Sequence, residues 1–231
     1  LPLAPMAILY NPVELPPAAP DSDRISGRVV FSGRLIAKKG VVPLLRAWPH
    51  VRAQVPGAEL HLYGRDGPAG HGGSMRAFLR GLIGDVPEPG VVFHGHVRRE
   101  ELLRALDTAS AAIFPSFAEA FAFAPMEAMA SGCATVYSRR GSGPELVEDG
   151  RDGLLVEPSD SGQIAETVVR LLADADLRLR LGRAGRRRVA EAFSMSVQLR
   201  ANEDFYRDAI ARFRSLGPRR GGRRDGQRET S

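Results

Sequence analysis

The scarcity of cysteine and the lack of long apolar runs limit the class of protein that this sequence can encode. A single cysteine, Cys133, excludes an internal disulfide and a metal site built on several thiolates. No apolar run approaches the roughly 20 residues that a membrane-spanning helix needs. The start, LPLAPMAILYNP, has no basic lead-in and no small-residue cleavage pattern, so we do not expect a signal peptide. These features favour a cytoplasmic protein, with peripheral membrane contact left open. Because residue 1 is not Met, we expect a longer parent chain.

Lysine is scarce as well. Only two of the 32 basic side chains are lysines, Lys38 and Lys39, and both lie in GRLIAKKG at residues 33–40. The net charge is +5, but residues 217–231 alone hold five arginines against two acids, which leaves the rest at about +2. We expect these last residues to be a disordered basic tail that serves solubility or contacts acidic lipid or nucleic acid. The nearly neutral body gives no reason to expect a nucleic-acid partner.

The rest of the chain alternates short apolar runs with helical spacing of apolar residues. Strands are predicted at residues 28–33, 58–64, 91–95, 111–116, 133–138 and 153–157, and helices at 40–54, 75–83, 98–109, 124–132, 161–174, 175–193 and 194–213. This alternation predicts an α/β fold with a Rossmann-like parallel sheet and helices on both faces. Pro49 should kink or shorten its helix, and the spacing of Ser142 and Glu145 predicts a capping box.

In a parallel sheet, ligands bind at the carboxyl ends of the strands, so the loops there are the candidate sites. GRLIAKKG follows the first predicted strand and matches neither the dinucleotide fingerprint nor the P-loop. Arg34 offers a planar fork of donors and Lys39 a compact charge, and together they could neutralise a diphosphate. They could equally be solvated loop charges.

A second candidate loop is PSFAEAFAFAPMEAMASG at residues 115–132. Pro125 favours a helix start there, which leaves Glu119 in the loop and puts Glu127 in the first helical turn. Free N–H groups near Phe123 and Ala124 would form an anion site. The Glu127 carboxylate could accept both hydrogens of a vicinal diol, or it could be only a favourable charge at a helix start.

Taken in order, these motifs resemble the retaining glycosyltransferases of family 4. The likeness runs from Asn11-Pro12-Val13-Glu14 to Phe193-Ser194, about 80% of the chain. It rests on Phe31-Ser32-Gly33-Arg34, Lys39-Gly40, Pro115-Ser116 with Glu119, Glu127 to Gly132, and the glycine-containing stretches at 141–145 and 149–153. The resemblance implies the C-terminal, donor-binding half of the two-domain GT-B fold. It gives residues 1–27 as interdomain linker, 28–193 as the nucleotide-sugar domain and 194–216 as a C-terminal helix.

The resemblance also implies roles for single residues. Arg34 and Lys39 would bind the donor diphosphate, and Glu119 would face the sugar. Other residues would contact the nucleotide: Gly33, Glu127 at the ribose, the N–H groups of Phe121, Ala122, Phe123 and Ala124, and His94, Gly95 and Val97 at the base. A UDP- or GDP-linked donor, a carbohydrate or lipid-linked acceptor, retention and no metal are implied. The acceptor site would lie in a missing N-terminal domain, so this chain alone would bind nucleotide without transfer.

Two departures keep alternatives open. The family usually has glycine where this chain has Ala120 and Ala122, and two methyl groups could narrow the sugar pocket or weaken the enzyme. A non-catalytic nucleotide-sugar-binding module therefore remains an alternative. A nicotinamide-dependent dehydrogenase would share the alternation of strands and helices. This chain, however, lacks the glycine fingerprint that such an enzyme has after its first strand. A nucleic-acid-binding protein would depend on the basic tail.

Other conspicuous residues have simpler interpretations. The D-x-D strings at 21–23 and 174–176 are expected to be a linker and a helix N-cap. His94 and His96 have no third metal ligand nearby in the sequence. The basic run at 186–188 is expected to be a solvated helix face, and Cys133 to be core packing.

Overall fold

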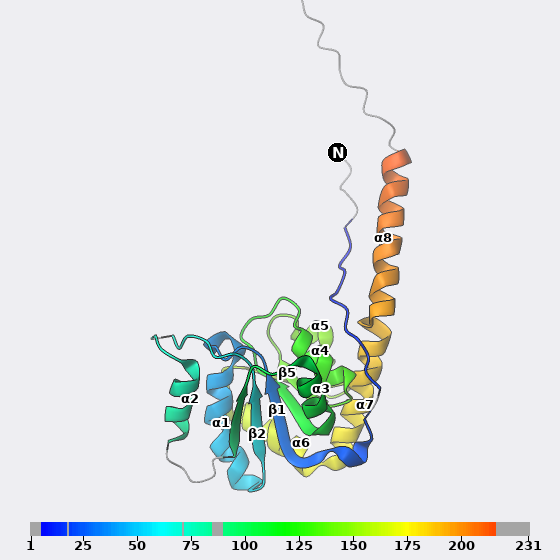
Figure 1. Ribbon diagram of the computed structural model, residues 1–231. Coiled ribbons are helices and arrows are strands. Elements are labelled where there is room, and N and C mark those ends of the chain that lie inside the picture. Colours follow the sequence, from blue (N-terminus) through cyan, green and yellow to red (C-terminus); the bar gives the residue numbers. More distant parts are fainter. Residues whose placement is uncertain (1–5, 18, 71, 85–89, 216–231) are drawn as a thin grey trace, which may run out of the picture.

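The structure is a computed structural model that describes residues 6–17, 19–70, 72–84 and 90–215. Its described part contains a six-stranded sheet in which every neighbouring pair is parallel (Figure 1). The strands are β1 (Ile25–Ser32), β2 (Glu59–Tyr63), β3 (Val91–Gly95), β4 (Ala109–Phe114), β5 (Ala134–Ser138) and β6 (Leu154–Val156). The predicted Rossmann-like fold is confirmed, and the expected tail at 217–231 lies outside the described residues.

The strand order is β3-β2-β1-β4-β5-β6, so the chain reverses its direction of travel across the sheet between β1 and β4. β1 pairs with β2 on one side and with β4 on the other. In an open parallel sheet such a reversal opens a crevice at the carboxyl ends of the two strands. The loops at residues 33–40 and 115–122 follow these strands and therefore flank the crevice.

Helices cover both faces of the sheet. One face carries α1 (Val41–Gln54) and α6 (Ser161–Ala173), and the other carries α3 (Arg99–Thr108) and α4 (Phe123–Ala130). α7 (Ala175–Ala192) contributes to both layers, with Leu177 and Leu181 in the first core and Val189 in the second. The remaining elements are α2 (Met75–Ile83), α5 (Gly143–Leu146), α8 (Met195–Ser215) and the 3-10 turns η1 (Asp21–Asp23) and η2 (Ala37–Lys39). Each layer thus buries one apolar stripe of a helix against the alternating side chains of the strands.

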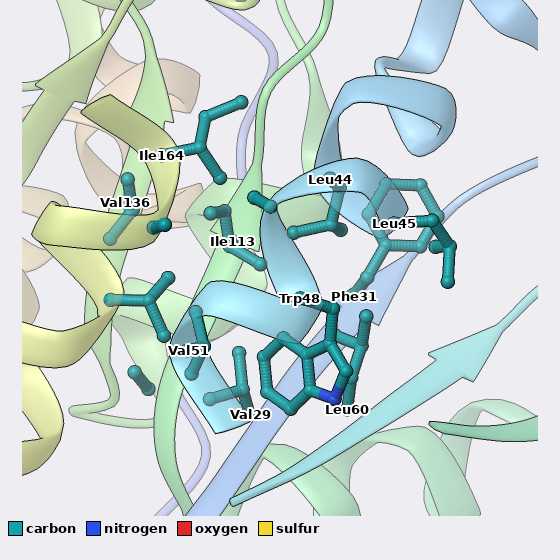
Figure 2. Packing of buried hydrophobic residues seen from close by; sticks show 14 of the residues in the cluster. Val29, Phe31, Leu44, Leu45, Trp48, Val51, Leu60, Ile113, Val136 and Ile164 are labelled. Carbon is teal, nitrogen blue, oxygen red and sulfur yellow. The ribbon is translucent and has the colours of Figure 1, made fainter. Parts of the chain in front are cut away.

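Packing of α1 on the sheet shows how this works (Figure 2). Trp48 and Val51 project from α1 onto Val29 and Phe31 of β1, and all four are buried. Burying a side chain of this size contributes about 1.5 to 3 kcal/mol. Pro49 lies inside α1, which continues to Gln54, so of the two predicted effects the shortening does not occur. Its buried neighbours on the same helix hold the turn against the sheet.

The segment before β1 is attached to the body of the domain. The Val13 N–H donates to the Phe193 carbonyl at 2.9 Å, and the Met195 N–H donates to the Val13 carbonyl at 3.2 Å. The Arg24 guanidinium donates to three carbonyls, those of Leu106, Ala109 and Ser131. From this junction α8 extends away from the sheet, with the N-terminal segment beside its first turns (Figure 1).

Two local predictions need correction. Ser142 precedes α5, but its hydroxyl pairs with the buried Tyr137 hydroxyl at 3.0 Å, so no capping box forms. Arg186 and Arg188 do not lie on a solvated face, because they donate to main-chain carbonyls of the segments beside α7: those of Pro16 and Ala130 for Arg186, and of Glu145 and Leu146 for Arg188.

Two further predictions are confirmed. Asp174 caps α7 through the Leu177 N–H at 2.8 Å. Cys133 is buried in the core beside α4.

Candidate functional site

The loops that follow β1 and β4 are in direct contact at the switch point. The Phe117 N–H donates to the Lys38 carbonyl at 2.8 Å. Gly40 has φ +72°, and a Cβ added to it would lie 1.8 Å from the Pro115 carbonyl oxygen. Only glycine fits both this left-handed conformation and this close approach. The contact fixes the end of the first loop over the start of the second.

This contact brings Lys39 and Glu119 together. The Lys39 ammonium donates to Glu119 Oε1, and the two side chains are 27% and 14% exposed. The preceding Lys38 is exposed. A cation and a carboxylate from two strand ends thus form one pair at the crevice.

Two polar side chains, Ser32 and Tyr137, are buried near the ends of β1 and β5. Burial raises the pKa of Tyr137 to about 12, while the hydrogen bond with Ser142 opposes the shift and the nearby Glu119 charge adds to it. Ser32 is the last residue of β1, and its side chain lies on the same face of the sheet as that of Tyr137 in β5. Its hydroxyl is buried and has no hydrogen-bond partner among the described residues. Ser32 was predicted only as part of a motif, and its unpaired hydroxyl was not foreseen.

Arg34 stands apart from the pair. It is exposed, and its Nε would lie 3.2 Å from a Cβ at Gly67, which belongs to the loop after β2. Within the described residues, no hydrogen bond or ion pair joins it to Lys39 or Glu119. Gly33 precedes it and donates its N–H to the Tyr63 carbonyl at 2.9 Å. Arg34 therefore flanks the crevice from the side of β2.

The start of α4 borders the same crevice. Ala122 is the N-cap residue and supplies no side-chain cap, and Phe123 is exposed. The first N–H groups of a helix have no partner within the helix and favour anions. Phe121, just before the helix, packs against Tyr10 and Phe193 with ring centroids 4.8 and 5.3 Å away. Ala122 and Ala124 are only partly buried.

Glu127 lies in the second turn of α4 and not in the predicted first turn, because the helix already begins at Phe123. It takes part in a bridge of three residues. Arg99 Nε lies 3.2 Å from Glu127 Oε1, and Arg99 Nη1 lies 2.9 Å from Glu14 Oε2. Burial acts to lower the pKa of Arg99, but the hydrogen bonds that Arg99 donates to the two carboxylates outweigh it and leave the pKa above its ordinary value. Sequence reasoning missed Arg99. Its signal was an arginine at the start of a helix, where the dipole disfavours a cation.

The loop predicted to line the base begins at the end of β3. The His94 ring stacks on Tyr63 with centroids 4.1 Å apart, and its Nε2 lies 2.9 Å from His61 Nδ1. The Gly95 carbonyl accepts from the Gly64 N–H at 2.7 Å, and Val97 packs against the core. These contacts tie the loop to the end of β2. Burial, followed by the charge of His61, lowers the pKa of His94.

The family model for glycosyl transferases group 1 matches residues 26–174 of the chain, well over half of its length. The chain belongs to this family.

Two relatives of the chain are longer than it is. A D-inositol 3-phosphate glycosyltransferase of Corynebacterium kroppenstedtii is 32% identical over 183 residues, 79% of this chain and 40% of that protein. An MMP alpha-(1->4)-mannosyltransferase of Mycolicibacterium hassiacum is 34% identical over 195 residues, 84% of this chain and 46% of that protein. The chain thus spans less than half the length of these two relatives.

A solved structure has the same fold. A mutant of S. aureus TarM in complex with fondaparinux, alpha-GlcNAc-glycerol and UDP matches with a TM-score of 0.73 and 20% sequence identity. The match covers 87% of this chain and 39% of that chain. At this identity the likeness concerns the fold.

A pocket of about 290 Å³ opens beside Glu127. Its lining residues are Pro12, Val13, Glu14, Arg99, Phe123, Glu127 and Met195. A second pocket of about 500 Å³ shares Val13, Glu14, Arg99 and Met195 with it. The N-terminal segment therefore forms one wall of the space in front of Glu127.

The described residues contain no group of three or more His, Cys, Asp or Glu side chains placed to bind a metal ion. Nor do their helices include one that is both long enough and apolar enough to cross a membrane.

Proposed function

We propose that the chain is the donor-binding half of a retaining glycosyltransferase of family 4. Such an enzyme moves a sugar from a nucleoside diphosphate sugar to an acceptor hydroxyl. The observation that carries the proposal is the contact between Lys39 and Glu119 at the switch point, where a cation and a carboxylate from adjacent strand ends lie together. Lys39 has the positive charge that the diphosphate side of the donor bond needs, and Glu119 has the carboxylate that can accept hydrogen bonds from the sugar side.

The residues of the first loop bind the diphosphate. As the bond to the sugar breaks, negative charge grows on the departing diphosphate, and Lys39, Arg34 and the N–H groups at residues 121–124 stabilise it. Each such donor contributes ~3 kcal/mol to a developing charge of this kind. Two cations and a helix start supply the positive charge that the diphosphate needs, so the reaction requires no metal.

Glu119 and Glu127 bind the two sugars of the donor. Glu119 accepts hydrogen bonds from hydroxyl groups of the transferred sugar, and Glu127 accepts from the nucleotide ribose. Gly33 gives the phosphates a close backbone approach, and His94, Gly95 and Val97 line the base. The donor is a UDP- or GDP-linked sugar. The UDP in the TarM complex, which has this fold, supports the former.

The acceptor site belongs to another part of the protein. Both relatives are more than twice as long as the segment that they share with this chain. Five apolar side chains of α8 are exposed along one stripe: Met195, Leu199, Tyr206, Ile210 and Phe213. A stripe of this kind fits coverage by a further domain. We assign residues 1–27 to the connection with that domain, 28–193 to donor binding and 194–216 to the closing helix. The protein acts in the cytoplasm, on a carbohydrate or lipid-linked acceptor.

Calorimetric titration of the chain with UDP, GDP and ADP tests the donor site. We expect heat of binding from UDP or GDP and no sugar transfer from the matching donor by this chain alone. A Lys39→Met variant should bind that nucleotide about tenfold or more weakly, and a Lys38→Met variant should bind it as the wild-type chain does. Absence of binding with all three nucleotides would reject the donor-site assignment.

A second function, a nucleotide-sugar-binding module without catalysis, is favoured by one observation. Ala120 and Ala122 place methyl groups where the resembled family has glycine, in the loop that borders Glu119. The discriminating experiment is Glu119→Ala in the full-length protein, with Glu166→Ala, at an exposed position of α6, as the control. Loss of sugar transfer with retained nucleotide binding supports the enzyme, whereas a wild-type protein that binds donor and never transfers supports the module.

A further inference from the structure

Arg99 connects three segments that are far apart in the sequence. It is the first residue of α3, Glu127 belongs to α4, and Glu14 belongs to the N-terminal segment. Glu127 is 16% exposed, whereas Arg99 is 48% exposed. The buried end of the bridge is therefore the carboxylate at the pocket, and its open end faces the N-terminal segment.

The chemistry of arginine suits this position. A guanidinium presents several N–H donors in a fixed plane, so one group can bind two carboxylates from different directions. Here Nε donates to Glu127 and Nη1 donates to Glu14. A lysine could supply the charge but not this fixed pair of directions. The arginine at a helix start, where the dipole disfavours it, is explained by these two acids.

The N-terminal segment contacts this half of the site a second time. Asn11 Nδ2 donates to the Phe121 carbonyl at 3.2 Å, and the Tyr10 ring packs on the Phe121 ring. Between Asn11 and Glu14, the main chain of Val13 is fixed by its hydrogen bonds with Phe193 and Met195. Residues 10–14 therefore contact Phe121 directly and Glu127 through Arg99.

We infer that Arg99 is a positioning residue, which orients the Glu127 carboxylate toward the nucleotide ribose and couples ribose binding to docking of residues 10–14. The inference rests on the proposed function and adds a residue to it. With Oε1 of Glu127 fixed by Arg99, the carboxylate presents one rotamer to the pocket in front of it. Coupling is reciprocal: if the docked segment favours ribose binding, ribose binding favours the docked segment.

The first test compares nucleotides with and without the ribose diol. UDP and 2′,3′-dideoxy-UDP are titrated into the wild-type chain and into Arg99→Met, Arg99→Lys and Arg104→Met, with the GDP pair used if GDP binds better. In Arg99→Met the preference for the diol should fall by about fivefold or more, while dideoxy affinity changes by less than about twofold. Arg99→Lys should restore part of the preference. Arg104, exposed on the same helix, provides the control and should change neither affinity.

The outcomes of these titrations distinguish a failure of the inference about Arg99 from a failure of the proposed donor-binding function. A wild-type preference for the diol that persists in Arg99→Met would overturn the inference and leave the proposed function standing. Equal losses for both nucleotides would also overturn it, because they indicate a general structural role. If neither nucleotide binds to the wild-type chain, both fail together.

The second test measures the coupling itself. Amide hydrogen exchange at residues 10–14 should slow when UDP binds to the wild-type chain, because binding strengthens the docked state. The slowing should be lost in Arg99→Met and reduced in Glu14→Gln. Exchange that responds to UDP equally in all three proteins would show that Arg99 does not couple the segment to the site.

Discussion

The Lys39 ammonium contacts the Glu119 carboxylate although 80 positions separate the two residues in the chain. They meet because β1 and β4 are neighbours in the sheet and the chain reverses between them. The pair is largely shielded from water, where a charged contact is stronger and an unpaired charge is more costly than at the surface. Lys39 therefore affects both stability and binding, and the two effects can be separated.

Replacing Lys39 by Met should raise the Kd for UDP about tenfold or more, since hydrogen bonds to charged groups are worth about 1.5 to 3 kcal/mol. It should also lower the free energy of unfolding, because it leaves Glu119 without its partner. Adding Glu119→Gln should recover part of that stability but not the affinity. Calorimetry and urea unfolding measure the two quantities. Lys38→Met is the matched control, and equal effects from it would contradict the assignment of Lys39.

Gly40 should tolerate no side chain. Gly40→Ala would require the left-handed conformation and would press a methyl group against the Pro115 carbonyl. We expect a loss of about 2 to 4 kcal/mol in the free energy of unfolding, measured with urea. Gly57→Ala is the control, because no atom lies within 4 Å of an added Cβ there. If both variants unfold at the same urea concentration, the close contact of the two loops is not real.

The fold was predictable from the sequence because local patterns encode it. Apolar runs gave all six strands, and helical spacing gave the helices that cover them. The order of the strands was not predictable, since it depends on which faces pack after collapse. The same limit applied to Pro49, whose local preference to break a helix was overridden by buried neighbours on both sides.

The site was predictable as a set of residues but not as a set of contacts. Motif spacing singled out Lys39, Glu119 and Glu127, and the sheet explains why the first two meet. Motif spacing could not give the partner of Glu127, because Arg99 follows a different strand, β3, and belongs to no recognised motif. Ser142 was assigned to a cap from spacing alone, whereas the buried Tyr137 hydroxyl offered it a better partner.

Tyr137 should make the protein sensitive to alkali. Its pKa is raised from 10.0 to about 12 in the folded protein, chiefly by burial, so folding disfavours its ionisation. Its contribution to stability is complete below pH 10 and is lost as the pH rises from about 10 to about 12. The loss should amount to about 2 to 3 kcal/mol. Urea unfolding at several pH values should show a flatter alkaline limb for Tyr137→Phe than for Tyr206→Phe, a control at an exposed tyrosine of α8. Parallel limbs would contradict the prediction.

His94 should titrate below the usual range for histidine. Its pKa is lowered from 6.5 by burial and then by the charge of His61, with Arg28 acting in the same direction and Glu101 of α3 opposing them. A lowered pKa means that the folded protein resists protonation of this ring. Stability is therefore complete above about pH 6.5 and declines as the pH falls toward the lower folded-state value. Imidazole NMR signals followed from pH 8 to pH 4 measure the midpoint.

The cause of the His94 shift can be tested by replacing its neighbour. His61→Phe retains a ring beside His94 and removes a charge and a hydrogen-bond partner, while Glu59, which pairs with His61, stays in place. The His94 pKa should then rise but remain below 6.5, because burial persists. The variant should also shift the acid limb of the unfolding curve to lower pH. A His94 midpoint that does not move would show that His61 exerts no charge on it, and that burial alone sets the protonation of the loop at the end of β3.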